Sequence, residues 1–151
     1  MSLGLLIGVG AGTLFGLLIV GLIYRRIPKR LKVDKFICDW KELQAYCRDK
    51  STWPNAIQEA DKLLDTALKK RKYKGKSMGE RMVSAQRIIT NNDQLWFAHN
   101  LAKKVIADPK LKLREADVKA ALIGFRQALK DLGALQSNDV ATQSADAKDT
   151  K

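Results

Sequence analysis

Near its N-terminus the chain contains the uncharged stretch LGLLIGVGAGTLFGLLIVGLIY, residues Leu3–Tyr24. A helix of this length would extend about 33 Å, and the hydrocarbon core of a bilayer is about 30 Å thick. The stretch therefore predicts a transmembrane helix. We expect residues 1–24 to form a membrane anchor to which the rest of the chain is tethered.

The segment that follows, residues 25–35, is strongly basic, with Asp34 as its one acidic residue. Cationic flanks remain on the cytoplasmic side of a membrane, which predicts a single-pass cell-membrane protein with its N-terminus outside and its C-terminal domain in the cytoplasm. A cleaved signal peptide would instead carry its positive charge before a shorter apolar run. Each cation beside anionic headgroups contributes about 1 kcal/mol of attraction. The predicted lipid contacts are Arg25, Arg26, Lys29, Arg30 and Lys32.

Glycine recurs at every fourth position of the predicted span, at Gly4, Gly8, Gly12 and Gly16. On a helix this spacing leaves a groove without side chains, which a second helix can approach closely. The pattern favours helix–helix packing and a homodimer. The alternative is that glycine is simply common in membrane spans.

The chain of 151 residues carries 28 basic and 16 acidic side chains, giving a net charge of +12. This excess suggests an anionic neighbour, either phospholipid or nucleic acid, although solubility and membrane topology are the alternative reasons for it. Two cysteines, Cys38 and Cys47, are too few for a disulfide scaffold. With His99 as the single histidine, we expect no metal and no cofactor.

After residue 35 the apolar residues recur at helical spacing, without strand-like alternation. Short helices joined by short loops pack antiparallel, so we expect an all-α fold, an up-and-down bundle of four core helices over residues 36–133. A first helix at Val33–Arg48 packs on this bundle or continues the anchor. The four core helices are expected at Pro54–Arg71, Met78–Thr90, Asn92–Ala107 and Arg114–Leu132. Residues 134–151 are polar and small, which predicts a disordered tail.

Three local signals refine these helices. Ser77 and Glu80 have the capping-box spacing at a helix start, Asn92 can cap the next helix, and Gly133 is the expected C-cap of the last one. A cluster of cations surrounds Gly75 and could contact nucleic acid or lipid, or be a solvated surface. Its members are Lys69, Lys70, Arg71, Lys72, Lys74 and Lys76.

Three blocks of sequence resemble a family of small membrane-anchored helical proteins from uncultured candidate-phylum bacteria. They are AIQEADKLLDTAL (Ala56–Leu68), YKGKSMGERM (Tyr73–Met82) and LWFAHNLAKKVIAD (Leu95–Asp108). Members look like a HEPN-type (higher eukaryote and prokaryote nucleotide-binding) bundle, whose third block continues as Leu-Trp-x-Ala-His-x-x-Arg-Asn-x-x-x-His. The resemblance implies a helical bundle and membrane anchoring.

The chain departs from this pattern in the Arg-Asn…His part, which HEPN ribonucleases use to cleave RNA. The matching residues are Leu95, Trp96, Ala98 and His99, whereas the Arg, Asn and His positions hold Ala102, Lys103 and Ala107. Alanine can neither polarise a phosphate nor transfer a proton. The resemblance therefore argues against ribonuclease activity in this chain.

Other candidates for chemistry are few. We expect His99 to be a partly buried structural residue. Asp61 and Asp65 share one helical face, and we expect them to be structural too, with Lys62, Lys69 and the capping environment as their partners. The sequence contains no phosphate-binding loop, nucleophile elbow or zinc-binding motif. We therefore expect no enzymatic activity but a non-enzymatic interaction module at the cytoplasmic membrane face, with an unidentified protein partner. The alternative is a membrane-tethered RNA- or DNA-binding protein or a degenerate HEPN-type ribonuclease relative.

Overall fold

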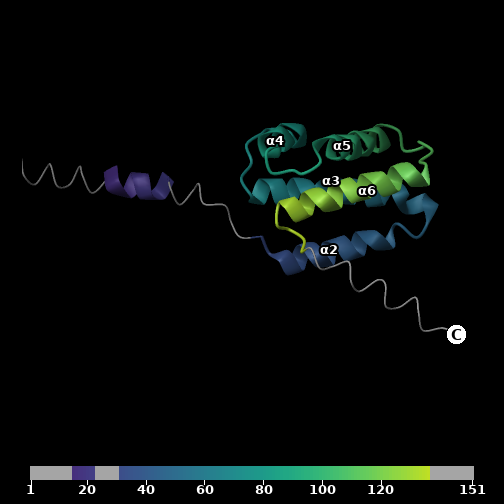
Figure 1. The fold of residues 1–151 in the computed structure, drawn as a ribbon, viewed down its shortest axis with the longest axis horizontal. Helices are drawn as coiled ribbons and strands as arrows, with labels where there is room; N and C mark the ends of the chain where they lie inside the picture. The colour runs from purple at the N-terminus through teal and green to yellow at the C-terminus, as the bar shows by residue number, and fades with distance from the viewer. Residues whose placement is uncertain (1–14, 23–30, 137–151) are drawn as a thin grey trace, which may run out of the picture.

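The computed structural model describes residues 15–22 and 31–136, and within these ranges every regular element is helical (Figure 1). This confirms the predicted all-α bundle. The elements are α2 (Val33–Ala45), the 3₁₀-helix η1 (Lys50–Thr52), α3 (Trp53–Lys70), α4 (Met78–Ala85), α5 (Asn92–Ala107) and α6 (Glu115–Asp131). Residues 15–22 form a further short helix.

Helix α3 is the centre of the bundle, because it contacts α2, α4, α5 and α6. Helices α4 and α5 lie on one side of α3 and α6, and α2 lies on the opposite side (Figure 1). The apolar stripe of α3 is fully buried at Ile57, Leu64 and Leu68. Each such side chain contributes about 1.5–3 kcal/mol through burial, so a stripe that faces several neighbours holds the layers together.

Helix α2 belongs to this bundle. Phe36, Trp40 and Leu43 recur at spacings of four and three and are buried, and α2 packs against α3. Leu31, which precedes the helix, is also buried. The packed domain therefore begins at Leu31, inside the segment predicted to be juxtamembrane, and not at residue 36.

The C-terminal end of the domain also lies beyond its predicted boundary. Gly133 has φ +69° and donates its N–H to the Lys130 carbonyl, while Ala134 donates to Leu129 over 2.8 Å. This is a Schellman motif, which confirms the predicted glycine cap. The motif turns Ala134 and Leu135 into the core, where both are buried. The prediction of a disordered tail from residue 134 is wrong for these two residues, and residues 137–151 lie outside the described part.

Two predicted helix boundaries are corrected by side-chain hydrogen bonds. Helix α4 ends at Ala85 and not near Thr90, because the Asn92 side-chain amide donates to the carbonyls of Gln86 and Ile89 and holds this segment in turns. The cap of α5 is Asn91 and not Asn92, since Asn91 Oδ1 accepts the N–H of Gln94 over 3.0 Å. At the start of α4 the predicted cap is confirmed, with Ser77 Oγ accepting from the Glu80 N–H.

The membrane anchor falls largely outside the described residues. Within residues 15–22 and 31–136, none of the helices combines the length and the apolar character needed to cross a membrane. The predicted span Leu3–Tyr24 is represented only by the short helix at 15–22. Of the residues predicted to pack helices or touch lipid, the structure describes Gly16 and Lys32, whereas Gly4, Gly8, Gly12, Arg25, Arg26, Lys29 and Arg30 lie outside it.

Candidate functional site

A groove of about 490 Å³ lies between α2 and α6, with the start of α3 beside it. Trp40 and Leu43 of α2, Trp53 of α3, and Val118, Leu122 and Ile123 of α6 supply its apolar lining. Gln44, Cys47, Glu115, Lys119 and Arg126 complete it. A volume of this size, an apolar lining and a few polar groups are typical of sites that bind ligands or partner segments.

The groove exists because of how the helices pack. Helices α2 and α6 each contact α3, but they make no backbone-level contact with each other. Ile123 remains 49% exposed on α6 although it lines an apolar surface. An open apolar surface of this kind is a common mark of an interaction site.

The loop at one end of the groove is fixed by three hydrogen bonds. Thr52 Oγ1 donates to the Tyr46 carbonyl over 2.6 Å, Asp49 Oδ1 accepts from the Ser51 N–H, and Trp53 Nε1 donates to the Cys47 carbonyl over 3.1 Å. The bond from Trp53 satisfies the indole N–H and sets the position of its ring. This end of the groove is therefore preorganised.

Two nitrogen atoms of groove-lining side chains are buried without a hydrogen-bond partner in the described part of the chain, Trp40 Nε1 and Arg126 Nε. Trp40 is 7% exposed, whereas Arg126 is only partly buried. A buried donor without an acceptor costs about 1–3 kcal/mol, and more when the group is charged. Both nitrogens are therefore buried within the walls of the groove and are not exposed to its open space.

Cys47, which also lines the groove, is a poor nucleophile. Burial raises the pKa of its thiol, so the protonated form prevails at neutral pH. This agrees with the prediction that Cys47 packs rather than reacts. Cys38 lies on the exposed side of α2 and serves as an internal comparison.

The two tryptophans of the groove should respond differently to replacement by phenylalanine. Trp53→Phe removes the hydrogen bond to the Cys47 carbonyl, whereas Trp40→Phe removes an N–H that is already unsatisfied. We expect Trp53→Phe to cost about 1 kcal/mol more in free energy of unfolding. Chemical denaturation of the two variants, followed by circular dichroism, measures this difference. Equal losses would mean that Trp40 Nε1 has a partner in solution.

A smaller groove of about 290 Å³ lies between α2 and α3. It is lined mainly by charged and polar residues, including Asp39, Glu42, Glu59 and Lys62, and Lys62 already pairs with Glu59 at 2.7 Å. Such a charged surface is well hydrated, so a partner that covered it would gain little binding free energy. The groove between α2 and α6 is the better candidate.

The predicted basic cluster is partly used within the fold. Lys69 pairs with Asp65 at 2.6 Å, Lys70 lies over the Phe36 ring at 5.3 Å, and Arg71 Nε donates to the Leu132 carbonyl over 2.8 Å. Lys72, Lys74 and Lys76 are exposed on the loop before α4. Lys70 and Arg71 therefore connect α3 to α2 and to the end of α6, whereas the Lys69 pair lies within α3 at the surface.

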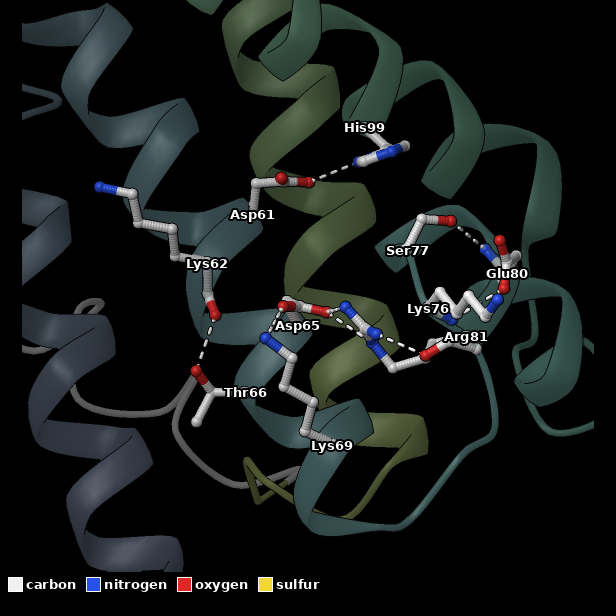
Figure 2. Close-up of polar contacts among 11 residues, drawn as sticks. Asp61, Lys62, Asp65, Thr66, Lys69, Lys76, Ser77, Glu80, Arg81 and His99 are labelled. Atoms are coloured by element: carbon white, nitrogen blue, oxygen red, sulfur yellow. Dashed lines mark hydrogen bonds and ion pairs between the residues drawn. The ribbon is translucent and has the colours of Figure 1, made fainter.

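A buried ion pair connects α3 with α4 (Figure 2). Arg81 donates to Asp65 Oδ1 from Nε over 2.8 Å and to the Gly75 carbonyl from Nη1 over 2.8 Å. Burial opposes ionisation of Asp65, but the hydrogen bonds and charges of Lys69 and Arg81 outweigh it and hold its pKa below the ordinary value. The predicted Asp65–Lys69 pair is confirmed, whereas sequence spacing did not indicate the Arg81 contact.

A second polar pair connects α3 with α5. His99 Nδ1 lies 2.8 Å from Asp61 Oδ1, and both side chains are largely buried (Figure 2). Burial of His99 agrees with its predicted structural role. Lys62, one of the partners predicted for the two aspartates, bonds to Glu59 instead, and Asp61 is paired with His99. Among the described residues, no hydroxyl or thiol group forms a hydrogen bond with the His99 ring.

The positions of the HEPN-type pattern lie on α5. Ala102 is fully buried in the core, whereas Lys103 and Ala107 are exposed. Comparison of the chain with known protein families, curated proteins and solved structures gives no match. The HEPN resemblance therefore stays a prediction, and the site must be interpreted from its own geometry.

Proposed function

We propose that this chain is a single-pass, membrane-anchored, non-enzymatic interaction module that holds its helical bundle at the cytoplasmic face. Its binding surface is the groove between α2 and α6, and its ligand is a helical segment of a protein partner. The observation that carries this proposal is the open apolar groove, whose lining includes two tryptophans and two cations.

The form of the groove suits a helix. Apolar side chains from two helices form its walls, and an amphipathic helix can lay its apolar face between them in the helix-in-groove mode. Trp40 and Trp53 are of the residue type most often responsible for binding energy at interfaces. The fixed loop between them reduces the conformational entropy lost on binding.

Membrane anchoring is supported by the N-terminal part of the chain. Phe15, Leu17 and Leu18 on the short helix are all more than 60% exposed, which in water is unfavourable for large apolar side chains. The stretch that contains them is long enough to span a bilayer, and the basic segment after it favours a cytoplasmic bundle.

The proposal can be tested by photo-crosslinking of the full chain in cells. A photoreactive benzoylphenylalanine replaces Ile123 in the groove or, as a matched control, Ile106, which is 59% exposed on α5. We expect a protein adduct from position 123 that is absent from position 106. Ile123→Gln with the photoreactive residue moved to Lys119 should weaken this adduct about tenfold, because it removes an apolar contact from the groove.

Thiol protection provides an independent measurement on the same surface. Alkylation of Cys47 should be several-fold slower in native membranes than in the purified full chain, whereas exposed Cys38 should react equally in both. Single-cysteine variants separate the two signals. Equal Cys47 rates would show that the groove is unoccupied in the cell and contradict the proposal.

The alternative functions have less support. Nucleic-acid binding would use the basic cluster, but Lys69, Lys70 and Arg71 are engaged within the fold. Adducts at position 123 that disappear on nuclease treatment, together with binding that weakens steeply with salt, would favour that function instead. A degenerate ribonuclease relative would keep the fold without the residues that cleave RNA.

A further inference from the structure

We infer that the end of the bundle at which α2 begins docks on the anionic surface of the membrane. Lysines at the start of α2 and in the loop before α4 make the contact. We call this surface the basic end, and its members, all exposed, are Lys32, Lys35, Lys74 and Lys76. The inference rests on the membrane anchoring in the proposed function and adds a lipid partner and an orientation of the bundle.

The basic end is assembled from segments that are far apart in the sequence. Helix α2 begins, and α3 and α6 end, at the same end of the bundle (Figure 1). Lys70 Nζ lies 5.3 Å from the centre of the Phe36 ring, which joins the end of α3 to the start of α2. Arg71 Nε donates to the Leu132 carbonyl over 2.8 Å, which joins it to the end of α6. The loop after α3 therefore lies at the end where the chain enters the bundle, at Leu31.

The loop before α4 is fixed by hydrogen bonds from that helix. The Gly75 carbonyl accepts from Arg81 Nη1 over 2.8 Å, and the Lys74 carbonyl accepts from Ser84 Oγ over 2.6 Å. Both bonds use main-chain oxygens of the loop, so the side chains of Lys74 and Lys76 take no part in them. A loop that is already held in place loses little conformational entropy when its lysines meet a surface.

The charge of the basic end is largely uncompensated. The ion pairs found within residues 31–136 involve none of its four lysines. Its exposed acidic neighbours in sequence are Asp34 and Glu80, and Glu80 Oε2 accepts the main-chain N–H of Lys76 over 2.7 Å. Residues 25–30, which lead into this end, add four cations and no acid. Clusters of cations beside a predicted span are typical of segments that bind anionic phospholipid.

The anchor determines which end of the bundle is used. Lys110 and Lys112 are exposed on the loop between α5 and α6, at the opposite end, so charge alone does not choose (Figure 1). Residues 23–30 can extend at most about 30 Å between the short helix and Leu31. Helix α3 has 18 residues and is about 27 Å long, so the opposite end lies farther from the anchor by roughly this length. Attraction to headgroups fades within about 8 Å at physiological ionic strength, which favours the basic end.

The test is the acetylation rate of individual lysines, measured by mass spectrometry on the full chain in nanodiscs. One set of discs contains phosphatidylcholine alone, and the other contains equal parts of phosphatidylcholine and phosphatidylglycerol. We expect Lys74 and Lys76 to react about fivefold more slowly in the anionic discs, the factor that matches the attraction of one lysine to such a surface. This difference should disappear at high salt. Lys110 and Lys112 should react at the same rate in both discs.

A pair of double variants tests whether the loop lysines hold the bundle on the membrane. Lys74→Gln with Lys76→Gln should reduce the anion-dependent protection of Lys35 at least about twofold, because two of the four docking charges are gone. Lys110→Gln with Lys112→Gln removes the same charge from the opposite end and should leave the protection of Lys35 unchanged. Circular dichroism verifies that both variants are folded.

The outcomes separate the inference from the proposed function. Protection of Lys32 and Lys35 alone, or protection of Lys35 that survives loss of the loop lysines, would overturn the inference and leave the anchored module. Protection of Lys74 and Lys76 by added RNA, and not by phosphatidylglycerol, would also overturn it and assign the surface to nucleic acid. Extraction of the chain from native membranes by alkaline carbonate would overturn both. Salt-sensitive protection of both segments, lost in the Lys74→Gln, Lys76→Gln variant, would support the inference.

Discussion

Replacing Arg81 with alanine is expected to lower the free energy of unfolding by about 3–5 kcal/mol. The Arg81 side chain is 8% exposed, and it donates to the Asp65 carboxylate and to the Gly75 carbonyl (Figure 2). Its removal leaves a carboxylate and a carbonyl without their strongest donor. Since these contacts join α4 and the preceding loop to α3, we expect this part of the bundle to loosen first.

The measurement is chemical denaturation of the full chain in micelles, followed by circular dichroism. Arg114→Ala is the matched control, because Arg114 also forms two hydrogen bonds with an aspartate, Asp117, but is exposed at the surface. That variant should show no measurable change, as is usual for exposed ion pairs. Similar losses in both variants would mean that burial does not determine the strength of the Arg81 pair.

The helices that depend on local signals could be predicted from the sequence. The stripes of α3 and α6, the Ser77 cap and the Gly133 cap are all encoded within a few residues. Errors arose where a distant or unexpected side chain intervenes. The Asn92 side-chain amide donates to the carbonyls of Gln86 and Ile89 just after α4, and the Schellman motif carries Ala134 and Leu135 into the core.

The polar pairs of the bundle were beyond prediction from spacing. His99 and Asp61 are 38 residues apart in sequence, and Arg81 and Asp65 are 16 apart. Periodicity places a residue on a helix face, but it does not determine which helices face one another. The best available signal was the pair Asp61 and Asp65. Their spacing of four residues shows that they share a helix face, but it does not show which residues they contact.

The groove also could not be predicted from sequence patterns, for a different reason. It forms where α2 and α6 fail to meet, and no sequence pattern marks a contact that is absent. Arg126 occurs on α6 among apolar residues, where it resembles any surface cation. Only the arrangement of helices shows that its Nε lacks an acceptor and that it lines the same groove as Trp40.

Gly124→Ala should lower the free energy of unfolding by about 2 kcal/mol, although alanine is the better helix former by about 1 kcal/mol. Gly124 lies where α6 crosses the first turn of α5. A methyl group there would stand 2.9 Å from the Gln94 carbonyl oxygen and 3.1 Å from Gln94 Cγ. The oxygen belongs to the backbone of a capped helix start, so it cannot move aside without disturbing the Asn91 cap and the bond from Gln94 Nε2 to Ala120.

Gly79→Ala gives the matched control within the same molecule. A methyl group at Gly79, on α4, would lie 3.4 Å from the Trp96 ring, which is ordinary van der Waals contact. The helix propensity of alanine then dominates, and this variant should be neutral or more stable by up to about 1 kcal/mol. Denaturation should thus show a loss of stability for Gly124→Ala and no loss for Gly79→Ala, although the chemical change is the same. A stabilised Gly124→Ala variant would show that α5 and α6 are farther apart in solution, because only additional space lets the propensity gain appear there.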